Sequence, residues 1–498
     1  MVPTEPTGEK QLAGWRRAVN NDHMDPGASR YRSARMANWD SVARGSVKWS
    51  APRKAYQTRL AEVYRNLIPS GQRVLESGMS KGDLLSALHP RFGVGIDLSS
   101  EMTRGAALRH QHLHVVQGDA EAAPFVGEFD AIVLSDLVGD LWDVQKAFEE
   151  ARALLTHNGR LVLNFYNRVW EPPLAAAQRL GAATRVMPQN WLTYEDVSNL
   201  LVLADFEVTR HWVEVLLPLS LPFVGALANR YLVHFWPFRE AALTHFVVAR
   251  PASGSLAPHQ PLVSVVVPAR NEAGNITEIF RRVPELGAGT ELIFVEGNSR
   301  DDTYATIERA IDAHPERRAR LLKQTGRGKG DAVRLGFEHA GGEVLMILDA
   351  DLTVAPEDLP RFYDALVSGK ADFVNGVRLV YPMQKQAMRF LNLLGNKFFS
   401  LAFSWLLGQS VKDTLCGTKV LWREDYARIA AQRAYFGDFD PFGDFDLLFG
   451  AARLNLKIVD MPIRYRERTY GTTNISRWKH GLLLLRMVLF AARRIKFV

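Results

Sequence analysis

Short apolar runs alternate with polar and amphipathic stretches along most of the chain. In the second half, residues 263–267 form a largely β-branched run that is expected to stop at Pro268, before a polar turn, and residues 344–348 form an apolar run that ends in two carboxylates. Runs of this length are typical of buried strands, and the stretches between them are long enough for helices. The alternation predicts α/β domains with mainly parallel sheets in both halves.

One segment interrupts this alternation. Residues 251–261 are rich in Ser, Gly, Pro and small side chains, and the run at 263–267 begins a new strand directly after them. A chain of 498 residues is too long for one ordinary core, so a division into domains is expected. The predicted parts are a polar N-terminal leader at 1–50, an α/β domain at 51–257, a second α/β domain at 258–476 and a basic amphipathic helix at 477–498.

The composition narrows the classes of function. Hydrophobic residues make up 47% and charged residues 23% of the chain, as in folded globular proteins. Cys416 is the only cysteine, which excludes an internal disulfide framework and indicates a reducing, cytoplasmic compartment. The N-terminus lacks an apolar core, so no secretory signal is expected. The formal net charge of +7 favours anionic partners, but no helix-turn-helix pattern or aromatic-interleaved basic stripe indicates nucleic acid.

Two stretches approach, without reaching, the length of a membrane-spanning helix. Residues 215–228 are apolar but contain two prolines. The C-terminal stretch has no acidic residue after Glu467 and joins an apolar run to Arg477, Lys479, Arg486, Arg493, Arg494 and Lys496. A helix of this kind suits the headgroup region of an anionic membrane, and the alternative is a helix docked on its own domain. We expect peripheral contact with the inner face of a membrane.

The first half carries glycines and carboxylates at the ends of predicted strands. Gly78 and Gly82 lie in a turn before a helix, where they let the backbone approach a ligand closely. Asp97 ends the next strand, about 20 residues further on, where a carboxylate can accept hydrogen bonds from ribose hydroxyls. Asp119 ends a third strand, where it can meet an adenine amino group.

These motifs resemble the class I S-adenosylmethionine-dependent methyltransferases, which implies a Rossmann-like fold and that cofactor. The resemblance covers roughly residues 70–170, and it implies cofactor contacts by Glu76, Gly78, Gly82, Asp97, Asp119 and Ala120. Ser80 stands where the family has its middle glycine, and a Cβ there would crowd the backbone that faces the cofactor. No catalytic base is evident, because Asp136, Asp140 and Asp143 can simply cap a helix. The alternative is a non-catalytic docking module.

Asp349 and Asp351 follow the apolar run at 344–348, with Ala350 between them. In an extended chain, residues two apart point to the same side, so both carboxylates face one spot. Their mutual repulsion must be relieved by a cation or by protonation, unless they lie in an ordinary solvated loop.

Three further motifs lie at predicted carboxyl ends of strands, where open α/β sheets bind ligands: P-A-R-N-E at 268–272, V-E-G-N-S at 295–299 and G-R-G-K-G at 326–330. Nearly all of residues 261–476 resembles glycosyltransferase family 2, with the inverting GT-A fold, and most of all its dolichol-phosphate mannosyltransferase-type members. The resemblance implies Mg²⁺ or Mn²⁺ on the catalytic pair Asp349 and Asp351. The implied donor nucleotide-binding residues are Pro268, Arg270, Glu272, Glu296, Lys329, Asp349, Ala350 and Asp351.

Glu296 stands where the family usually has an aspartate that accepts from a nucleobase N–H, and Gly297 replaces the usual second acid. Uracil and guanine both present such an N–H, so UDP and GDP stay open. The segment D-T-L-C-G-T-K at 413–419 resembles the family's acceptor-side segment, in which Asp413, Thr414, Gly417 and Lys419 are expected to order the loop. Cys416 is expected to be a packed residue and not a nucleophile.

Two classes of acceptor stay open. An alcohol is a poor nucleophile and needs a carboxylate base, which Asp446 or Asp444 would supply. A lipid phosphate oxygen is already anionic and needs cations to hold it. The candidate cations are Arg378, Arg389, Lys397, Arg466 and Arg468, of which Arg378 and Arg468 match family positions best, while Arg389 and Lys397 also fit a solvated helix face.

The sequence therefore predicts a bifunctional protein. The second half transfers a hexose from a nucleotide-diphosphate sugar to a polyprenyl phosphate, with inversion, and Arg378 takes part in catalysis. The first half resembles a methyltransferase. The alternative is transfer to a hydroxyl acceptor in glycan synthesis, with Asp446 or Asp444 as base and the first half as a docking module.

Overall fold

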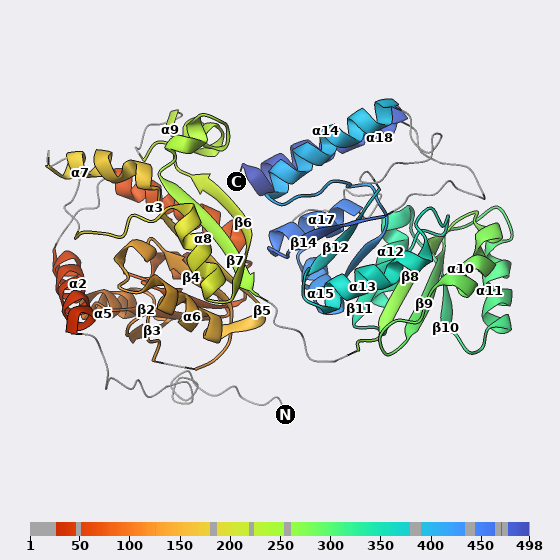
Figure 1. Ribbon diagram of the computed structural model, residues 1–498, viewed down its shortest axis with the longest axis horizontal. Coiled ribbons are helices and arrows are strands. Elements are labelled where there is room, and N and C mark those ends of the chain that lie inside the picture. The colour runs from red at the N-terminus through yellow and green to blue at the C-terminus, as the bar shows by residue number, and fades with distance from the viewer. Residues whose placement is uncertain are drawn as a thin grey trace. The chain divides into compact units, whose positions relative to one another are not determined.

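The computed structural model divides the chain into two compact units, Met1–Ala252 and Ser253–Phe497 (Figure 1). It describes residues 26–45, 51–124, 126–179, 187–218, 224–252, 260–378, 390–433, 444–463, 470 and 477–497. The division falls in the Ser-, Gly- and Pro-rich segment from which the sequence predicts a boundary. The predicted bounds of the four parts stay predictions.

The first unit is built on a seven-stranded sheet with the strand order β3-β2-β1-β4-β5-β7-β6. The strands are β1 (Arg73–Ser77), β2 (Phe92–Asp97), β3 (His114–Gln117), β4 (Phe129–Ser135), β5 (Leu155–Tyr166), β6 (Phe206–Glu214) and β7 (Thr244–Pro251). Strands β1 to β5 are parallel, and β7 runs antiparallel to both β5 and β6. The chain leaves β1 toward β2 and returns to β4 on its other side, so the topological switch point lies at the carboxyl ends of β1 and β4.

Helices pack on both faces of this sheet, and each face buries its own apolar cluster. The helices are α2 (Pro26–Arg44), α3 (Ala51–Leu67), α4 (Asp83–Ala87), α5 (Ser100–Arg109), α6 (Val144–Leu154), α7 (Glu171–Arg179), α8 (Tyr194–Leu203) and α9 (Val224–Arg230). Short 3₁₀ turns lie at η1 (Val138–Asp140), η2 (Arg168–Trp170), η3 (Leu232–His234) and η4 (Phe238–Ala241). Successive residues of β1, Val74 and Leu75, belong to different clusters, because neighbouring side chains in a strand point to opposite faces.

The second unit has a seven-stranded sheet of its own, with the order β10-β9-β8-β11-β13-β12-β14. The strands are β8 (Val263–Ala269), β9 (Thr290–Glu296), β10 (Arg318–Lys323), β11 (Val344–Ile347), β12 (Phe373–Val377), β13 (Lys419–Trp422) and β14 (Ile458–Pro462). Only β13 is antiparallel to its neighbours. The switch point lies between β8 and β11, and the α/β class predicted for both halves is confirmed.

The helices of this unit again cover both faces of the sheet. They are α10 (Ile276–Arg282), α11 (Thr303–Ala313), α12 (Lys329–Glu338), α13 (Leu359–Val367), α14 (Phe390–Leu407), α15 (Arg423–Ala431), α17 (Asp444–Arg453) and α18 (Arg477–Ala491), with short turns at η5 (Ala273–Asn275), η6 (Pro356–Asp358) and η7 (Ala492–Lys496). Val265 and Val266 belong to different buried clusters. Burial on both faces explains why the run at 263–267 is apolar except for Ser264, whose buried hydroxyl donates to Glu291 at 2.7 Å.

Pro268 does not end its strand, contrary to the expectation from the sequence. It lies within β8 and pairs in register with Val295 of β9. On the other side of β8, the pairing with β11 ends at Val266, so no β11 residue lies opposite Pro268. A proline, which has no N–H to donate, is tolerated at such a position.

Helices α14 and α18 lie side by side on the second unit (Figure 1). Leu484, Met487 and Ala491 of α18 are buried in the core of the unit. Leu482, Leu485 and Leu489 on the same helix are exposed, as are Phe398 and Leu401 of α14. The C-terminal helix is therefore docked on its own domain and also keeps an exposed apolar side. Among the described residues, no helix has both the length and the hydropathy needed to cross a bilayer.

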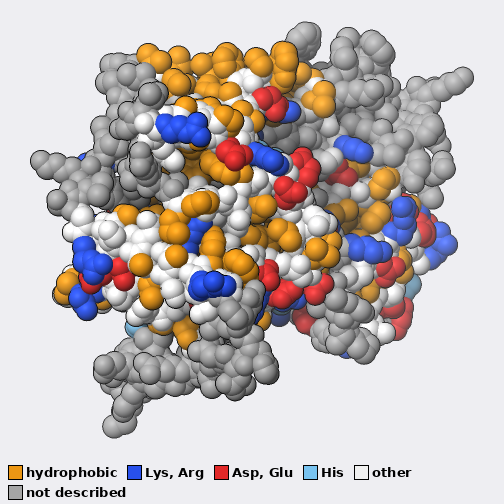
Figure 2. All heavy atoms as spheres, turned by 60° about the vertical axis from the view of Figure 1, so that its left-hand side comes forward, with side chains coloured by type: hydrophobic (Ala, Val, Ile, Leu, Met, Phe, Trp, Pro, Cys, Tyr) orange, Lys and Arg blue, Asp and Glu red, His pale blue; other side chains and the backbone are white. Residues whose placement is uncertain are grey.

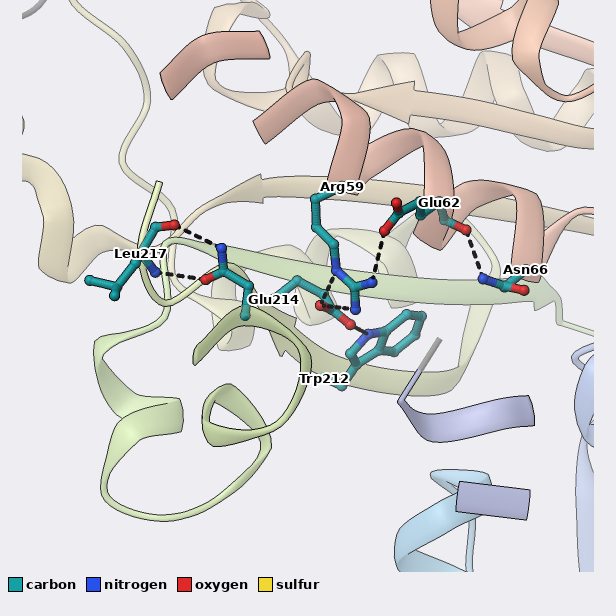
Figure 3. A network of polar contacts seen from close by, with 7 residues as sticks. Arg59, Glu62, Asn66, Trp212, Glu214 and Leu217 are labelled. Carbon is teal, nitrogen blue, oxygen red and sulfur yellow. Dashed lines mark hydrogen bonds and ion pairs between the residues drawn. The ribbon is translucent and has the colours of Figure 1, made fainter. Parts of the chain in front are cut away.

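A buried ion pair fixes α3 against the edge of the first sheet (Figure 3). Arg59 of α3 donates to the Glu214 carboxylate of β6 through Nε at 3.3 Å and Nη2 at 3.0 Å, and Trp212 Nε1 donates to the same carboxylate at 3.0 Å. Only 3% of the Glu214 side chain is exposed. Arg59 also contacts Glu62 at 3.2 Å, but 44% of the Glu62 side chain is exposed.

We expect Glu214→Gln to lower the free energy of unfolding of the first unit by about 3–5 kcal/mol, because it leaves Arg59 buried without its counter-charge. The matched variant Glu62→Gln should cost about 1 kcal/mol or less, since its pair is exposed. Urea titration followed by tryptophan fluorescence measures both, since most of the chain's 11 tryptophans lie in the first unit. Equal transition midpoints for the two variants would contradict this role of Glu214.

Candidate functional site

The carboxyl ends of β8, β9 and β11 meet at the switch point of the second sheet. The predicted pair Asp349 and Asp351 follows β11 there. Lys329 Nζ lies 2.5 Å from Asp349 Oδ1. Asp351 Oδ1 accepts from the Thr353 backbone N–H at 3.1 Å and from its hydroxyl at 2.8 Å. The structure therefore brings the two carboxylates and Lys329 to one site, and adds Thr353, which the sequence analysis missed.

Lys329 is placed by the start of α12. It is the first residue of that helix and follows Gly328, whose φ of +85° favours glycine. Burial by itself would raise the pKa of Asp349, but the adjacent Lys329 holds that pKa below its ordinary value. Lys419 and Arg378 shift this pKa in the same direction. The Asp349 carboxylate is thus ionised in a cationic environment.

The segment at 413–419 closes over this pair. A Cβ at Gly417 would overlap both Asp349 Oδ2 and Lys329 Nζ, so a side chain there would force this pair to shift. Lys419 has a fully buried side chain, and its Nζ donates to the Cys416 carbonyl at 2.5 Å. The ordering role expected for Gly417 and Lys419 is consistent with these contacts.

The loop after β8 is interlocked with the loop after β9 and the start of α11. Glu272 is buried, accepts from Asn275 Nδ2 at 2.8 Å, and donates its backbone N–H to Thr303 Oγ1 at 2.9 Å. Glu296 is also buried and accepts from the Ser299 backbone N–H at 2.5 Å. Arg270 is exposed beside them. These contacts fix both loops at the sheet edge, and the expectation that Glu296 meets a nucleobase stays a prediction.

The structure gives the acceptor candidates different surroundings. Arg378 forms a bidentate pair with Asp413, with Nε to Oδ2 at 2.7 Å and Nη2 to Oδ1 at 2.9 Å. Asp446 is buried and pairs with Arg433 Nε at 2.9 Å. Three other candidates, Arg389, Arg466 and Arg468, lie outside the described residues. Lys397 and Asp444 lie in described helices, but their side chains are not described.

The first unit contains a cavity of about 480 Å³ at its switch point. Its lining includes the predicted residues Glu76, Gly78, Asp97, Asp119 and Ala120, together with Ser80. Gly82 does not line the cavity; it precedes α4 with a φ of +75°, a conformation that favours glycine. The structure therefore brings together five of the six predicted cofactor residues.

Glu76 and Asp97, which both line this cavity, differ in their hydrogen bonding. Glu76 Oε2 is buried and has no hydrogen-bond partner among the described residues. Burial raises the pKa of Glu76 well above its usual range. Asp97 accepts backbone N–H groups from Ser80 and Ser99, each at 2.9 Å, and burial raises its pKa to about 6. An unpaired buried carboxylate oxygen is a place for a cationic group of a ligand.

Ser80 itself adopts a positive φ of 51°, the left-handed region where glycine is favoured. Its hydroxyl lies 3.6 Å from the Met102 sulfur. The side chain thus contacts a residue of α5 that also lines the cavity.

Helix α2 was missed, because the sequence analysis treated residues 1–50 as a polar leader. Tyr31, Arg35 and Trp39 recur every four residues, a spacing that puts them on one helix face and could have signalled the helix. All three line the cavity together with Arg32. Arg32 Nε pairs with Asp119 Oδ2 at 2.5 Å, so a predicted adenine contact is held by α2.

The three aspartates after β4 have different roles, and only one is the helix cap that the sequence analysis considered. Asp143 caps α6 by accepting from the Lys146 N–H at 3.0 Å. Asp140 instead binds Arg35 Nη1 at 2.8 Å, and Asp136 accepts from the Tyr56 hydroxyl at 2.8 Å. Asp140 therefore holds α2, and Asp136 holds α3, against the segment that follows β4.

Comparison with known families matches each unit separately. The family described as Glycosyl transferase family 2 matches residues 264–427, and the family described as Methyltransferase domain matches residues 74–159. The chain therefore resembles a methyltransferase domain in its first half and a family 2 glycosyltransferase in its second half, in the order that the sequence predicts.

Curated relatives match the glycosyltransferase half. Glycosyltransferase AglJ of Haloferax volcanii is 29% identical over 226 residues, which are 45% of this chain and 70% of the relative. Polyprenol monophosphomannose synthase of Mycolicibacterium smegmatis is 28% identical over 43% of this chain and 80% of its own length. Dolichol-phosphate mannosyltransferase of Pyrococcus furiosus is 33% identical over 43% of this chain and 59% of its own length. Each of these relatives thus matches less than half of the chain.

Cys416 should be inert in the folded protein. Its side chain is buried, and burial raises the pKa of its thiol to about 12, so almost no thiolate forms at neutral pH. We expect no reaction of the native protein with a disulfide reagent such as DTNB at pH 8, and one thiol per chain after unfolding in guanidinium. Rapid reaction of the native protein would contradict the packed position of Cys416.

Proposed function

We propose that the second unit transfers a hexose from a nucleotide-diphosphate sugar to a polyprenyl phosphate of the dolichol or undecaprenyl type, with inversion at the anomeric carbon. The observation that carries the proposal is the pair Asp349 and Asp351 at the switch point beside Lys329. Relatives of this unit named polyprenol monophosphomannose synthase and dolichol-phosphate mannosyltransferase support a polyprenyl phosphate as the acceptor.

The donor would bind along the carboxyl ends of β8, β9 and β11. The proposed donor-binding residues lie at the ends of these strands, in the loops that follow them and at the start of α12: Pro268, Arg270, Glu272, Glu296, Lys329, Asp349, Ala350 and Asp351. Exposed Arg270 and partly exposed Lys329 offer positive charge for the diphosphate. The buried contacts of Glu272 and Glu296 support a preformed pocket for the nucleoside.

A divalent cation, Mg²⁺ or Mn²⁺, fits this donor set. Among the described residues no group of three or more metal-binding side chains occurs, and Mg²⁺ is commonly held by one or two carboxylates together with substrate phosphates and water. Asp349 and Asp351 would hold the ion, which would neutralise the charge that develops on the leaving diphosphate. Thr353 keeps Asp351 oriented through its two hydrogen bonds.

The anionic oxygen of a lipid phosphate needs no base, so the proposed role of the acceptor side is to hold negative charge. Arg378, Arg389, Lys397 and Arg468 are the proposed contacts. Asp413 orients Arg378 through the bidentate pair. In the alternative, a hydroxyl acceptor would require Asp446 or Asp444 as base, and the buried pair of Asp446 with Arg433 favours a structural role for Asp446 instead.

The assay that tests the acceptor offers a panel of UDP- and GDP-sugars with polyprenyl phosphate or polyprenol, in the presence of Mn²⁺. We expect glycosylated polyprenyl phosphate and no glycosylated polyprenol by mass spectrometry. Asp446→Asn should keep turnover within about threefold of wild type while lowering thermal stability, whereas loss of a general base costs about 10²–10⁴-fold. Asp349→Asn, which removes a proposed metal ligand, is the control for lost activity.

A loss of 100-fold or more in folded Asp446→Asn, or transfer to polyprenol at the rate of the phosphate, would establish the hydroxyl alternative. Asp444→Asn tests the other candidate base in the same assay, and we expect its turnover to stay within about threefold of wild type as well.

For the first unit we propose that the 480 Å³ cavity binds S-adenosylmethionine for methyl transfer. The unpaired Glu76 oxygen suits the cationic amino group of the methionine part, and Asp97 and Asp119 suit the ribose and adenine. When bound, this cofactor supplies an electrophilic methyl group. The docking-module alternative predicts that the cavity binds no cofactor.

We expect cofactor binding to release a proton from Glu76. Burial raises its pKa, and a bound cation would stabilise the ionised carboxylate, so the proton leaves on binding. Calorimetry at pH 7.5 in buffers of different ionisation enthalpy measures the release. Glu76→Gln should abolish it and weaken binding, whereas Glu149→Gln, which changes an exposed acid of α6 outside the cavity lining, should change neither. Unchanged proton release in Glu76→Gln contradicts the assignment, and no binding by wild type supports the docking alternative.

The second unit is also proposed to contact the inner face of the membrane, where its lipid acceptor would lie. Exposed Leu482 and Leu489 of α18 and Leu401 of α14 offer apolar contact, and exposed Arg493 and Arg494 offer positive charge near them in the sequence. On the face drawn in Figure 2, Lys and Arg side chains lie among Asp and Glu side chains.

A further inference from the structure

The ion pair between Lys329 and Asp349 occupies the place where the proposed metal must bind. Lys329 Nζ lies 2.5 Å from Asp349 Oδ1, and the two side chains are 27% and 25% exposed. The pair is thus formed at the edge of the site, within reach of a ligand that arrives from solvent.

Several features of the chain build this contact. Gly328, at a φ of +85°, starts α12 so that Lys329 is its first residue. Pairing of β11 with β8 and β13 fixes the strand that Asp349 follows. Gly417, which cannot carry a Cβ without overlapping both partners, closes over the pair. Residues that are distant in the sequence thus converge on one contact.

We propose that Lys329 is a stand-in counter-ion: without donor its ammonium neutralises Asp349, and it moves to the donor diphosphate when metal and donor bind. This inference rests on the proposed glycosyltransferase function. A divalent ion shared by Asp349 and Asp351 would lie next to the ammonium, and like charges at such separations repel. The ion must therefore displace Lys329 in order to bind.

The position of Lys329 on α12 favours the exchange. A cation in the first turn of a helix faces the positive end of the helix dipole, so Lys329 is held there by Asp349 against this field. A diphosphate at the same place interacts favourably with both the helix end and the ammonium. The donor thus offers Lys329 a better partner at the moment when the metal needs Asp349.

Two effects of opposite sign follow from the exchange. Metal alone has to compete with Lys329, so it binds weakly to the wild-type protein. Metal together with nucleoside diphosphate binds tightly, because Lys329 then gains the diphosphate as partner. By linkage, Lys329 strengthens the coupling between the two ligands.

The test titrates Mn²⁺ into the full chain without nucleotide and follows free Mn²⁺ by electron paramagnetic resonance. We expect Lys329→Met to bind Mn²⁺ at least about fivefold more tightly than wild type. Lys370→Met, which removes the same charge from an exposed position of the same unit, should bind like wild type. In the presence of UDP or GDP, Lys329→Met should instead bind the metal–nucleotide complex more weakly than wild type.

Equal or weaker binding of Mn²⁺ alone by Lys329→Met would overturn the proposal, as would an equal gain in Lys370→Met. If Lys329→Met does not fold, Lys329→Gln serves in the same assay. Asp349→Asn separates this proposal from the metal site itself: if Asp349→Asn still binds Mn²⁺ like wild type, the proposed site is wrong, whatever Lys329 does.

Discussion

A carboxylate at the end of a buried strand needs a cation, hydrogen-bond donors or a proton to compensate its charge, and at Asp349 the cation that meets this need organises the second unit. Asp349 follows β11 at the switch point between β8 and β11, and Lys329 supplies the positive charge that compensates its carboxylate. A Cβ at Gly417 would overlap both members of the pair, so the glycine leaves room for it. The glycine-rich turn, the helix that it starts and the segment at 413–419 therefore all serve one electrostatic arrangement.

In the first unit, by contrast, a buried carboxylate oxygen has no hydrogen-bond partner among the described residues. It belongs to Glu76, which lines the cavity, so a ligand can bring the cation that pairs with it. Helix α2 lines that cavity through Arg32 and Arg35, which pair with Asp119 and Asp140. Both units thus place their ligand chemistry at the switch point of a sheet, where strand ends leave room for it.

The parts that could be predicted from sequence are those in which motif and strand are adjacent in the chain. The position of Asp349 after β11, and of Asp97 after β2, follows from apolar runs that end in acids. The rest depends on packing between distant segments. The contact of Gly417 with Lys329 and the ion pair of Asp446 with Arg433 join residues that are not adjacent in the chain. No local sequence pattern indicates either of them. Pro268 stays in β8 because its neighbour β11 is short, which only pairing in three dimensions reveals.

The central claim is that Asp349 and Asp351 hold a divalent ion on the diphosphate of a nucleotide sugar while a lipid phosphate attacks. The most direct measurement is the rate of nucleoside diphosphate release with donor and polyprenyl phosphate, for wild type with Mn²⁺, wild type with excess EDTA, and Asp351→Asn. The account predicts a loss of at least about 100-fold for the last two, as expected when a Lewis acid is removed from the leaving group. An unchanged rate with EDTA, or in Asp351→Asn, would contradict it.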